Sequence, residues 1–126
     1  MHLFLAAALG GAAGAGARYL VNVAAVHLLG PAFPWATLFV NVAGSFLMGL
    51  VVGVSESLLG GSALARTFLA TGILGGFTTF SAFSLDAVSL YERHQAALAA
   101  VYVVASVAIS IAALVAGLAT AKAVAS

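Results

Sequence analysis

GGFTTFSAFS, residues Gly75–Ser84, lies where an apolar, membrane-spanning segment would be expected to continue as a helix. It combines paired glycines and paired threonines with phenylalanines at positions 77, 80 and 83. Non-helical backbone at membrane depth occurs only where the freed polar groups are buried in protein or line a wet cavity. Two interpretations are therefore open: a glycine-rich but continuous helix with hydroxyls bonded to preceding carbonyls, or a helix broken within Gly75–Thr78.

The composition around this segment is that of an integral membrane protein. Of the 126 residues, 64% are hydrophobic and 6% are charged, and the mean hydropathy is +1.23. A soluble domain carries about 25% charged residues, so this chain cannot build a water-facing surface. The net charge of +1 excludes the basic field that nucleic acid requires. The absence of cysteine excludes disulfides and thiolate metal sites.

Four apolar blocks are long enough to cross a bilayer, which takes about 20 residues per helix. We expect an all-α membrane protein with a single transmembrane domain, residues 1–126, and helices at about residues 3–26, 35–55, 64–91 and 95–121. The first block has no basic leader and is too long for a signal-peptide core, so it is expected to remain as a helix. The expected location is the inner (plasma) membrane, with multiple passes.

The distribution of positive charges only weakly biases the orientation of the chain in the membrane. Arg66 and Lys122 fall on the side of the termini, and Arg93 falls on the opposite side. Since the Lys/Arg bias sets topology, a count of two against one leaves two interpretations. The chain inserts in one weakly specified orientation, or it inserts in both orientations and forms antiparallel dimers.

Small and polar residues recur at intervals of four on three of the expected helices. The stripes are Gly10, Gly14, Arg18 and Asn22; Thr37, Asn41, Ser45, Gly49 and Gly53; and Tyr102, Ser106 and Ser110. Close helix packing explains the glycines. The Asn41 amide and the hydroxyls of the fourth helix exceed what packing requires. A lining of donors without carboxylates favours an anion over a cation.

Arg18 and two phenylalanines each allow two interpretations. Arg18 lies deep in the first span, so it either extends to the headgroups or raises the positive potential of a vestibule. Phe80 and Phe83 are three residues apart and share a helix face. Because the edge of an aromatic ring is positive, these rings could stabilise a small anion, although such pairs also occur as ordinary core.

Three segments together resemble a known family: GGAAGAGARY (Gly10–Tyr19), TLFVNVAGSFLMG (Thr37–Gly49) and GILGGFTTFSAFS (Gly72–Ser84). Along nearly its whole length the chain is similar to the fluoride ion channels of the Fluc (CrcB) family. The resemblance implies an antiparallel, dual-topology homodimer with an interrupted third helix and two narrow pores. It also implies passive export of fluoride, protection of the cell against fluoride, and no enzymatic activity.

The resemblance further implies roles for individual residues. Gly75 and Thr78 of both subunits would bind a central sodium ion through their backbone carbonyls, and Arg18 would lie at an aqueous vestibule. The usual family motif has threonine where this chain has Ala82, so that hydroxyl is absent; we expect conduction to survive. The implied fluoride pathway comprises Thr37, Asn41, Phe80, Ser81, Phe83, Tyr102, Ser106 and Ser110.

Two rival functions are considered. A small proton-coupled multidrug or cation exporter would need a titratable carboxylate in the membrane, but the first expected helix has no Asp or Glu and its only charged side chain is Arg18. A scaffold without transport would use the polar stripes for packing alone. The expected partners are fluoride, sodium, the lipid bilayer and a second copy of the chain.

Overall fold

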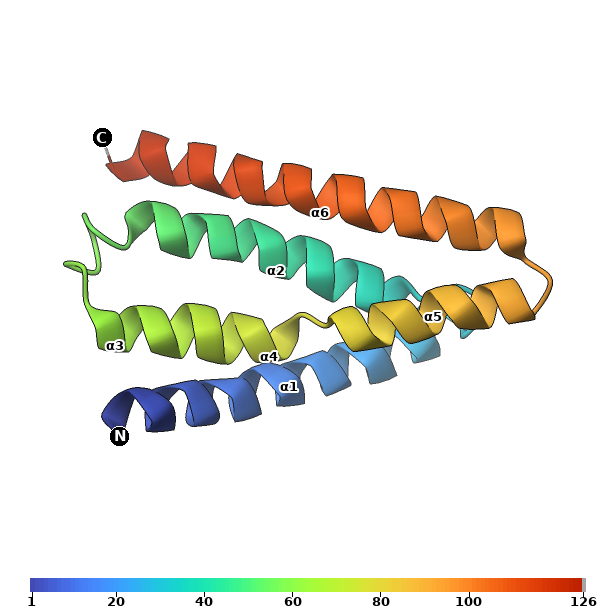
Figure 1. Cartoon of the computed structure of the whole chain (residues 1–126), viewed down its shortest axis with the longest axis horizontal. Helices are drawn as coiled ribbons and strands as arrows, with labels where there is room; N and C mark the ends of the chain where they lie inside the picture. The colour runs from blue at the N-terminus through green and yellow to red at the C-terminus, as the bar shows by residue number, and fades with distance from the viewer. Residues whose placement is uncertain (126) are drawn as a thin grey trace.

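The computed structural model describes residues 1–125, and within them it contains helices, turns and loops but no strand. The elements are α1 (His2–Leu29), α2 (Trp35–Val54), α3 (Ala63–Arg66), the π-helical segment η1 (Thr67–Leu74), α4 (Gly75–Phe77), α5 (Phe80–Glu92) and α6 (Ala96–Ala125). Figure 1 shows the helices running side by side, with both ends of the chain at the same end of the bundle.

Four stretches of the described chain are long and apolar enough to cross a membrane: His2–Leu29, Trp35–Val54, Ala63–Glu92 and Ala96–Ala125. The third is composed of α3, η1, α4 and α5 and is interrupted between α4 and α5. The prediction of an all-helical protein with four spans and a bent third helix is confirmed.

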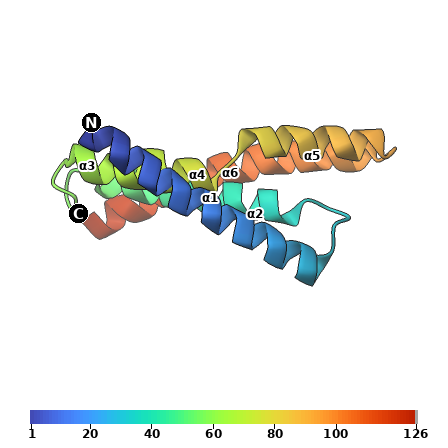
Figure 2. The same ribbon diagram turned by 90° about the horizontal axis from the view of Figure 1, so that it is seen from below.

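The helices form two closely packed pairs. α2 lies along α6, and α1 lies along η1 and α4. After the interruption, α5 packs against α6. Figure 2 shows the consequence: α5 and α6 diverge from α1 and α2 toward the end of the bundle that holds the α1–α2 loop. The interruption thus transfers the third span from one pair to the other.

Glycines make both pairs possible by letting backbones approach. A methyl group added to Gly10 would lie 2.9 Å from the Gly72 Cα, and one added to Gly14 would overlap the Ile73 carbonyl oxygen. Between α2 and α6, a methyl group on Gly49 would lie 2.8 Å from the Leu118 nitrogen. These are distances that Cβ atoms cannot adopt, so the small-residue stripes are helix-packing surfaces.

The interruption falls on Thr78 and Thr79, so the predicted break within Gly75–Thr78 is confirmed at Thr78, whereas Gly75 and Gly76 remain helical. Gly75 is helical (φ −61°, ψ −39°), whereas Thr78 (φ −88°, ψ 159°) and Thr79 (φ −153°, ψ 127°) are extended. β-Branched residues suit extended backbone. In addition, the Thr79 hydroxyl caps α5 by accepting from the Ala82 N–H at 3.2 Å. The neighbouring Gly76 serves packing, because a methyl group there would lie 2.5 Å from the Gly11 carbonyl oxygen.

Candidate functional site

A groove with a cavity volume of about 420 Å³ lies beside the break, between α2, α5 and α6. Its walls include the extended residues Thr78 and Thr79. Five of the eight residues predicted for the fluoride pathway line it: Asn41, Phe80, Phe83, Ser106 and Ser110. Three helices therefore bring together residues that are up to 69 positions apart in the sequence (110 − 41).

The hydroxyls of Ser106 and Ser110 have no hydrogen-bond partner although both oxygens are buried. Back-bonding to a carbonyl one turn earlier is the ordinary alternative for a helical hydroxyl. Thr120 on the same helix takes that alternative and donates to the Ala116 carbonyl at 2.8 Å. The Ser106 and Ser110 hydroxyls take no such bond, so packing within the chain does not supply them with a partner.

The side chain of Asn41 forms hydrogen bonds with the backbone of Thr79, within the break. Its Nδ2 donates to the Thr79 carbonyl at 3.0 Å, and its Oδ1 accepts from the Thr79 N–H at 2.8 Å. The amide thus satisfies both backbone groups of an extended residue that no strand or helix serves. An amide nitrogen carries two hydrogens, so the Thr79 carbonyl uses only part of its donor capacity.

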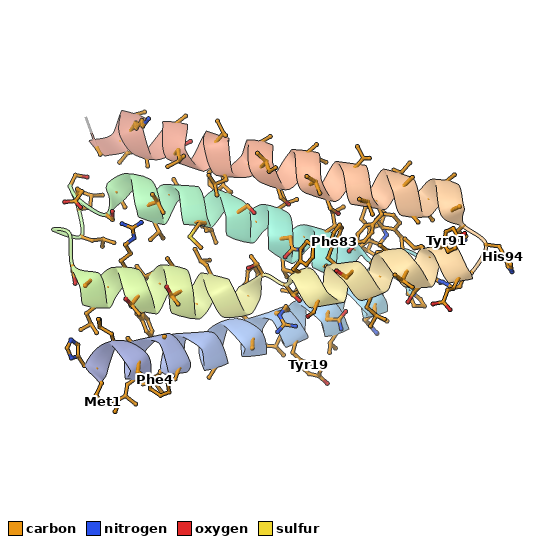
Figure 3. The ribbon with its side chains drawn as sticks, viewed as in Figure 1. Met1, Phe4, Tyr19, Phe83, Tyr91 and His94 are labelled. Carbon is orange, nitrogen blue, oxygen red and sulfur yellow. The ribbon has the colours of Figure 1, made fainter. Side chains whose placement is uncertain are left out.

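The two phenylalanines differ in environment although they are in contact. Their ring centroids are 5.6 Å apart and their planes meet at 51°. Phe83 is 8% exposed and points into the bundle (Figure 3), whereas Phe80 is 77% exposed. Phe83 therefore belongs to the interior of this chain, and Phe80 presents its ring outward at the edge of the groove.

Tyr102 is fully buried, and its hydroxyl donates to the Asp86 Oδ2 at 3.1 Å. Its ring lies edge-on to Phe33, with centroids 5.5 Å apart, and packs at 5.3 Å from Phe83. The hydroxyl thus points to α5 instead of joining the serines along the groove. Asp86 was not among the predicted site residues. The signal that could have found it is that Asp86 is the one carboxylate well inside an expected span.

A second cavity of about 160 Å³ holds Thr37, the only predicted pathway residue found there. Asp86 and Arg93 also line it, and the Arg93 Nη2 lies 3.5 Å from the Ala32 carbonyl oxygen in the α1–α2 loop. Phe33 belongs to this cavity and Phe83 to the groove. The Tyr102 ring contacts both phenylalanines, so it packs between a residue of the smaller cavity and a residue of the groove.

Two further predicted residues lie outside both cavities. The Arg18 Nε donates to the Gly76 carbonyl at 3.0 Å, so the guanidinium binds the last turn before the break. Neither interpretation of the sequence foresaw this partner. Ser81 is exposed on α5, with its hydroxyl oxygen 3.4 Å from that of Thr79.

The backbone carbonyls of Gly75 and Thr78 both lose their helical donors. The Thr79 N–H, which would close a turn on Gly75, goes to Asn41. The Ala82 N–H, which would close a turn on Thr78, goes to the Thr79 hydroxyl. Carbonyl oxygens are the ligand type that hard cations prefer, so the chemistry of this pair fits a sodium ion.

These features define a small multi-pass membrane protein with a donor-lined groove beside a broken helix. The family model for CrcB-like proteins, described as Camphor Resistance (CrcB), matches residues 5–118. The chain belongs to this family. Together with its four apolar helices, this makes it an integral protein of the bacterial plasma membrane.

Named relatives are similar over almost the whole chain. A fluoride-specific ion channel FluC from Cereibacter sphaeroides (strain ATCC 17029 / ATH 2.4.9) is 61% identical over 118 residues, which cover 94% of this chain and 93% of the relative. Proteins of the same name from Agrobacterium fabrum (strain C58) and Rhodopseudomonas palustris (strain BisB5) are 58% and 53% identical. The aligned residues cover 89% and 96% of this chain, and 90% and 98% of those relatives.

Proposed function

We propose that this chain is a passive fluoride channel that releases fluoride from the cytoplasm through the groove beside the break. Support comes from the lining, in which hydroxyls and an amide are joined by aromatic rings, and from the names of the relatives. Among the described lining residues of the groove there is no carboxylate. Donors without acids suit an anion.

The observation that carries the proposal is the pair of buried, unpartnered serine hydroxyls. Leaving a buried polar group unsatisfied costs about 1–3 kcal/mol. Such groups in a folded protein therefore call for an explanation. Fluoride supplies one, because it is a small anion that accepts hydrogen bonds. Ser106 and Ser110 are one turn apart on α6, so their hydroxyls could donate to successive positions of a moving ion.

The proposed assembly is an antiparallel homodimer with two pores. Phe80 is largely uncovered at the groove, and Gly75, Ser81 and Ser84 are exposed on the same span. Polar groups facing lipid are costly, so a protein surface is a better neighbour for this part of the third span. The two-against-one count of basic residues is compatible with insertion in both orientations.

A sodium ion on the two-fold axis completes the proposal. Gly75 and Thr78 of each subunit would contribute backbone carbonyls, so two copies would surround the ion with oxygen. When bound, the ion would supply positive potential to the two flanking anion pathways. The exposure of Gly75 in the single chain is compatible with a position at the surface between two copies.

The physiological role follows from acid–base chemistry. Hydrogen fluoride crosses membranes as a neutral molecule and ionises in the cytoplasm, which traps fluoride inside the cell. A passive channel lets the anion leave down its gradient and so confers fluoride resistance.

The test is fluoride release from liposomes, followed with a fluoride electrode. Wild-type protein should release fluoride far faster than protein-free vesicles. Ser106→Ala and Ser110→Ala should each slow release by about tenfold, since a hydrogen bond to a charged group is worth about 1.5–3 kcal/mol.

Thr120→Ala is the matched control, because it removes a hydroxyl from the same helix that is already bonded to the Ala116 carbonyl. It should leave release unchanged. If folded, dimeric wild-type protein releases no more fluoride than empty vesicles do, the proposed function is wrong.

A further inference from the structure

The backbone carbonyls around the break fall into two groups. Some accept a hydrogen bond from a side chain on another helix, and others have lost the N–H that would bind them in a continuous helix. Arg18 of α1 donates to the Gly76 carbonyl, and Asn41 of α2 donates to the Thr79 carbonyl. The carbonyls of Gly75 and Thr78, which alternate with these, are the ones proposed to bind sodium. Arg18 and Asn41 thus occupy the carbonyls of Gly76 and Thr79, whereas those of Gly75 and Thr78 have lost their helical donors.

Asn41 has a second contact that decides whether the Gly75 carbonyl is free. In a continuous helix, the N–H of residue 79 would donate to the carbonyl of residue 75. Here the Asn41 Oδ1 accepts that N–H at 2.8 Å. Without this acceptor, the partly buried Thr79 N–H would need another partner, and in a continuous helix that partner is the Gly75 carbonyl. The side chain of Asn41 therefore competes with the helix for the donor that would cover Gly75.

We propose that Asn41 is a positioning residue for the sodium site: by holding Thr79 in its extended conformation, it keeps the Gly75 carbonyl available to the cation. The inference rests on the proposed function, in which Asn41 also lines the fluoride pathway. One side chain then couples the two ions, because the residue that faces the anion groove also sets the geometry of the cation ligands. Asn41 acts through Thr79 and has no contact with sodium in this account.

The two hydrogen bonds of Asn41 can be separated by substitution. Asn41→Asp keeps an oxygen that can accept the Thr79 N–H, but it removes the donor to the Thr79 carbonyl and places a carboxylate in the anion groove. Asn41→Ala removes both bonds. The inference therefore predicts that the two variants share a loss of fluoride release but differ in their response to sodium.

The experiment measures the Tm of the purified, detergent-solubilised protein as NaCl replaces choline chloride at constant ionic strength. Wild-type protein should gain stability with sodium, as expected when a ligand binds the folded state alone. In Asn41→Ala, the sodium concentration for the half-maximal shift should rise by about tenfold or more, the usual effect of losing a residue that orients metal ligands. Asn41→Asp should retain the sodium-dependent shift while fluoride release is lost.

Ser106→Ala is the matched control, since it alters the groove without contacting the break, and its sodium response should equal that of the wild type. If Asn41→Ala does not purify as a folded protein, Asn41→Leu takes its place, because leucine is similar in size and can form neither hydrogen bond with Thr79. If Asn41→Ala or its replacement keeps the full sodium-dependent Tm shift of the wild type, the role of Asn41 is overturned. The role is also overturned if Asn41→Asp loses the shift to the same extent as Asn41→Ala. Absence of any shift in wild-type protein would instead contradict the sodium site itself.

Discussion

Tyr102 illustrates how one side chain organises the polar interior of the bundle. Its ring contacts Phe33 on the side of the small cavity and Phe83 on the side of the groove. Its hydroxyl donates to Asp86. Because a carboxyl group inside a membrane protein is costly without a hydrogen-bond partner, Tyr102 both packs between residues of the two cavities and gives Asp86 a partner beside the smaller one.

Tyr102→Phe keeps the ring and removes only the hydroxyl, so the packing should survive while Asp86 loses its donor. We expect the free energy of unfolding to fall by about 1 kcal/mol, the usual value of a side-chain hydrogen bond in a membrane protein. Thermal unfolding in detergent measures the change. Tyr91→Phe is the control: Tyr91 is 67% exposed and should lose its hydroxyl without effect. Equal Tm values for wild type and Tyr102→Phe would show that the bond does not contribute.

At the residue scale, the sequence predicted the composition of the groove better than the direction of its side chains. The i+4 stripes correctly indicated that Ser106 and Ser110 share a face, and the structure brings Asn41 to the same groove. Thr37 precedes Asn41 by one turn yet lines the other cavity. Arg18 bonds to a residue 58 positions away, and local spacing carries no information about such a partner.

At the element scale, the third span divides its unusual residues between packing and interruption. Gly72 and Gly76 face α1 at distances that exclude a side chain. Thr78 and Thr79 adopt the extended conformation, and Thr79 begins α5. The hydroxyl of Thr78 donates to the Leu74 carbonyl at 2.9 Å, so Thr78 still bonds to the last turn before the break. Glycine is the usual marker of a helix break, but here the break needs residues that favour extended backbone and can cap a new helix.

The packing of α1 on the third span gives a prediction with an internal control. Gly14→Ala would place a methyl group on the Ile73 carbonyl oxygen, so α1 must shift. We expect a loss of about 1–3 kcal/mol in the free energy of unfolding, as for other overpacked sites. Gly16→Ala has nothing within 4 Å of the new methyl group and should be neutral or slightly stabilising. Thermal unfolding of both variants is the measurement, and a Gly14→Ala variant as stable as Gly16→Ala would contradict the packing.

The sequence sufficed for the number of spans but not for the position of the break. Apolar length alone indicates four helices, since little else satisfies the backbone in lipid. The position of the break depends on Asn41 and Arg18, which bind Thr79 and Gly76 from other helices. These contacts exist only after the helices have packed, so local propensity could not distinguish a break at the glycines from one at the threonines.

At the scale of the whole molecule, the transfer of the third span from α1 to α6 creates the groove and leaves it open to one side. Figure 2 shows α5 and α6 diverging from α1 and α2 beyond the break. Phe80 is uncovered there, and Gly75 and Ser81 are also exposed on the same span. A second copy of the chain is the occupant that the proposed function assigns to this face, and the near balance of basic residues permits it to insert upside down.

The central claim is that fluoride crosses alone, as a charged ion and down its gradient. The most direct measurement uses liposomes loaded with potassium fluoride in a potassium-free medium at matched pH, with a fluoride electrode outside. We predict that fluoride appears only after valinomycin lets potassium leave to balance the charge, and that an imposed pH gradient does not change the rate. Release that proceeds without valinomycin and stops when the pH gradient is removed would contradict the account and indicate proton-coupled transport.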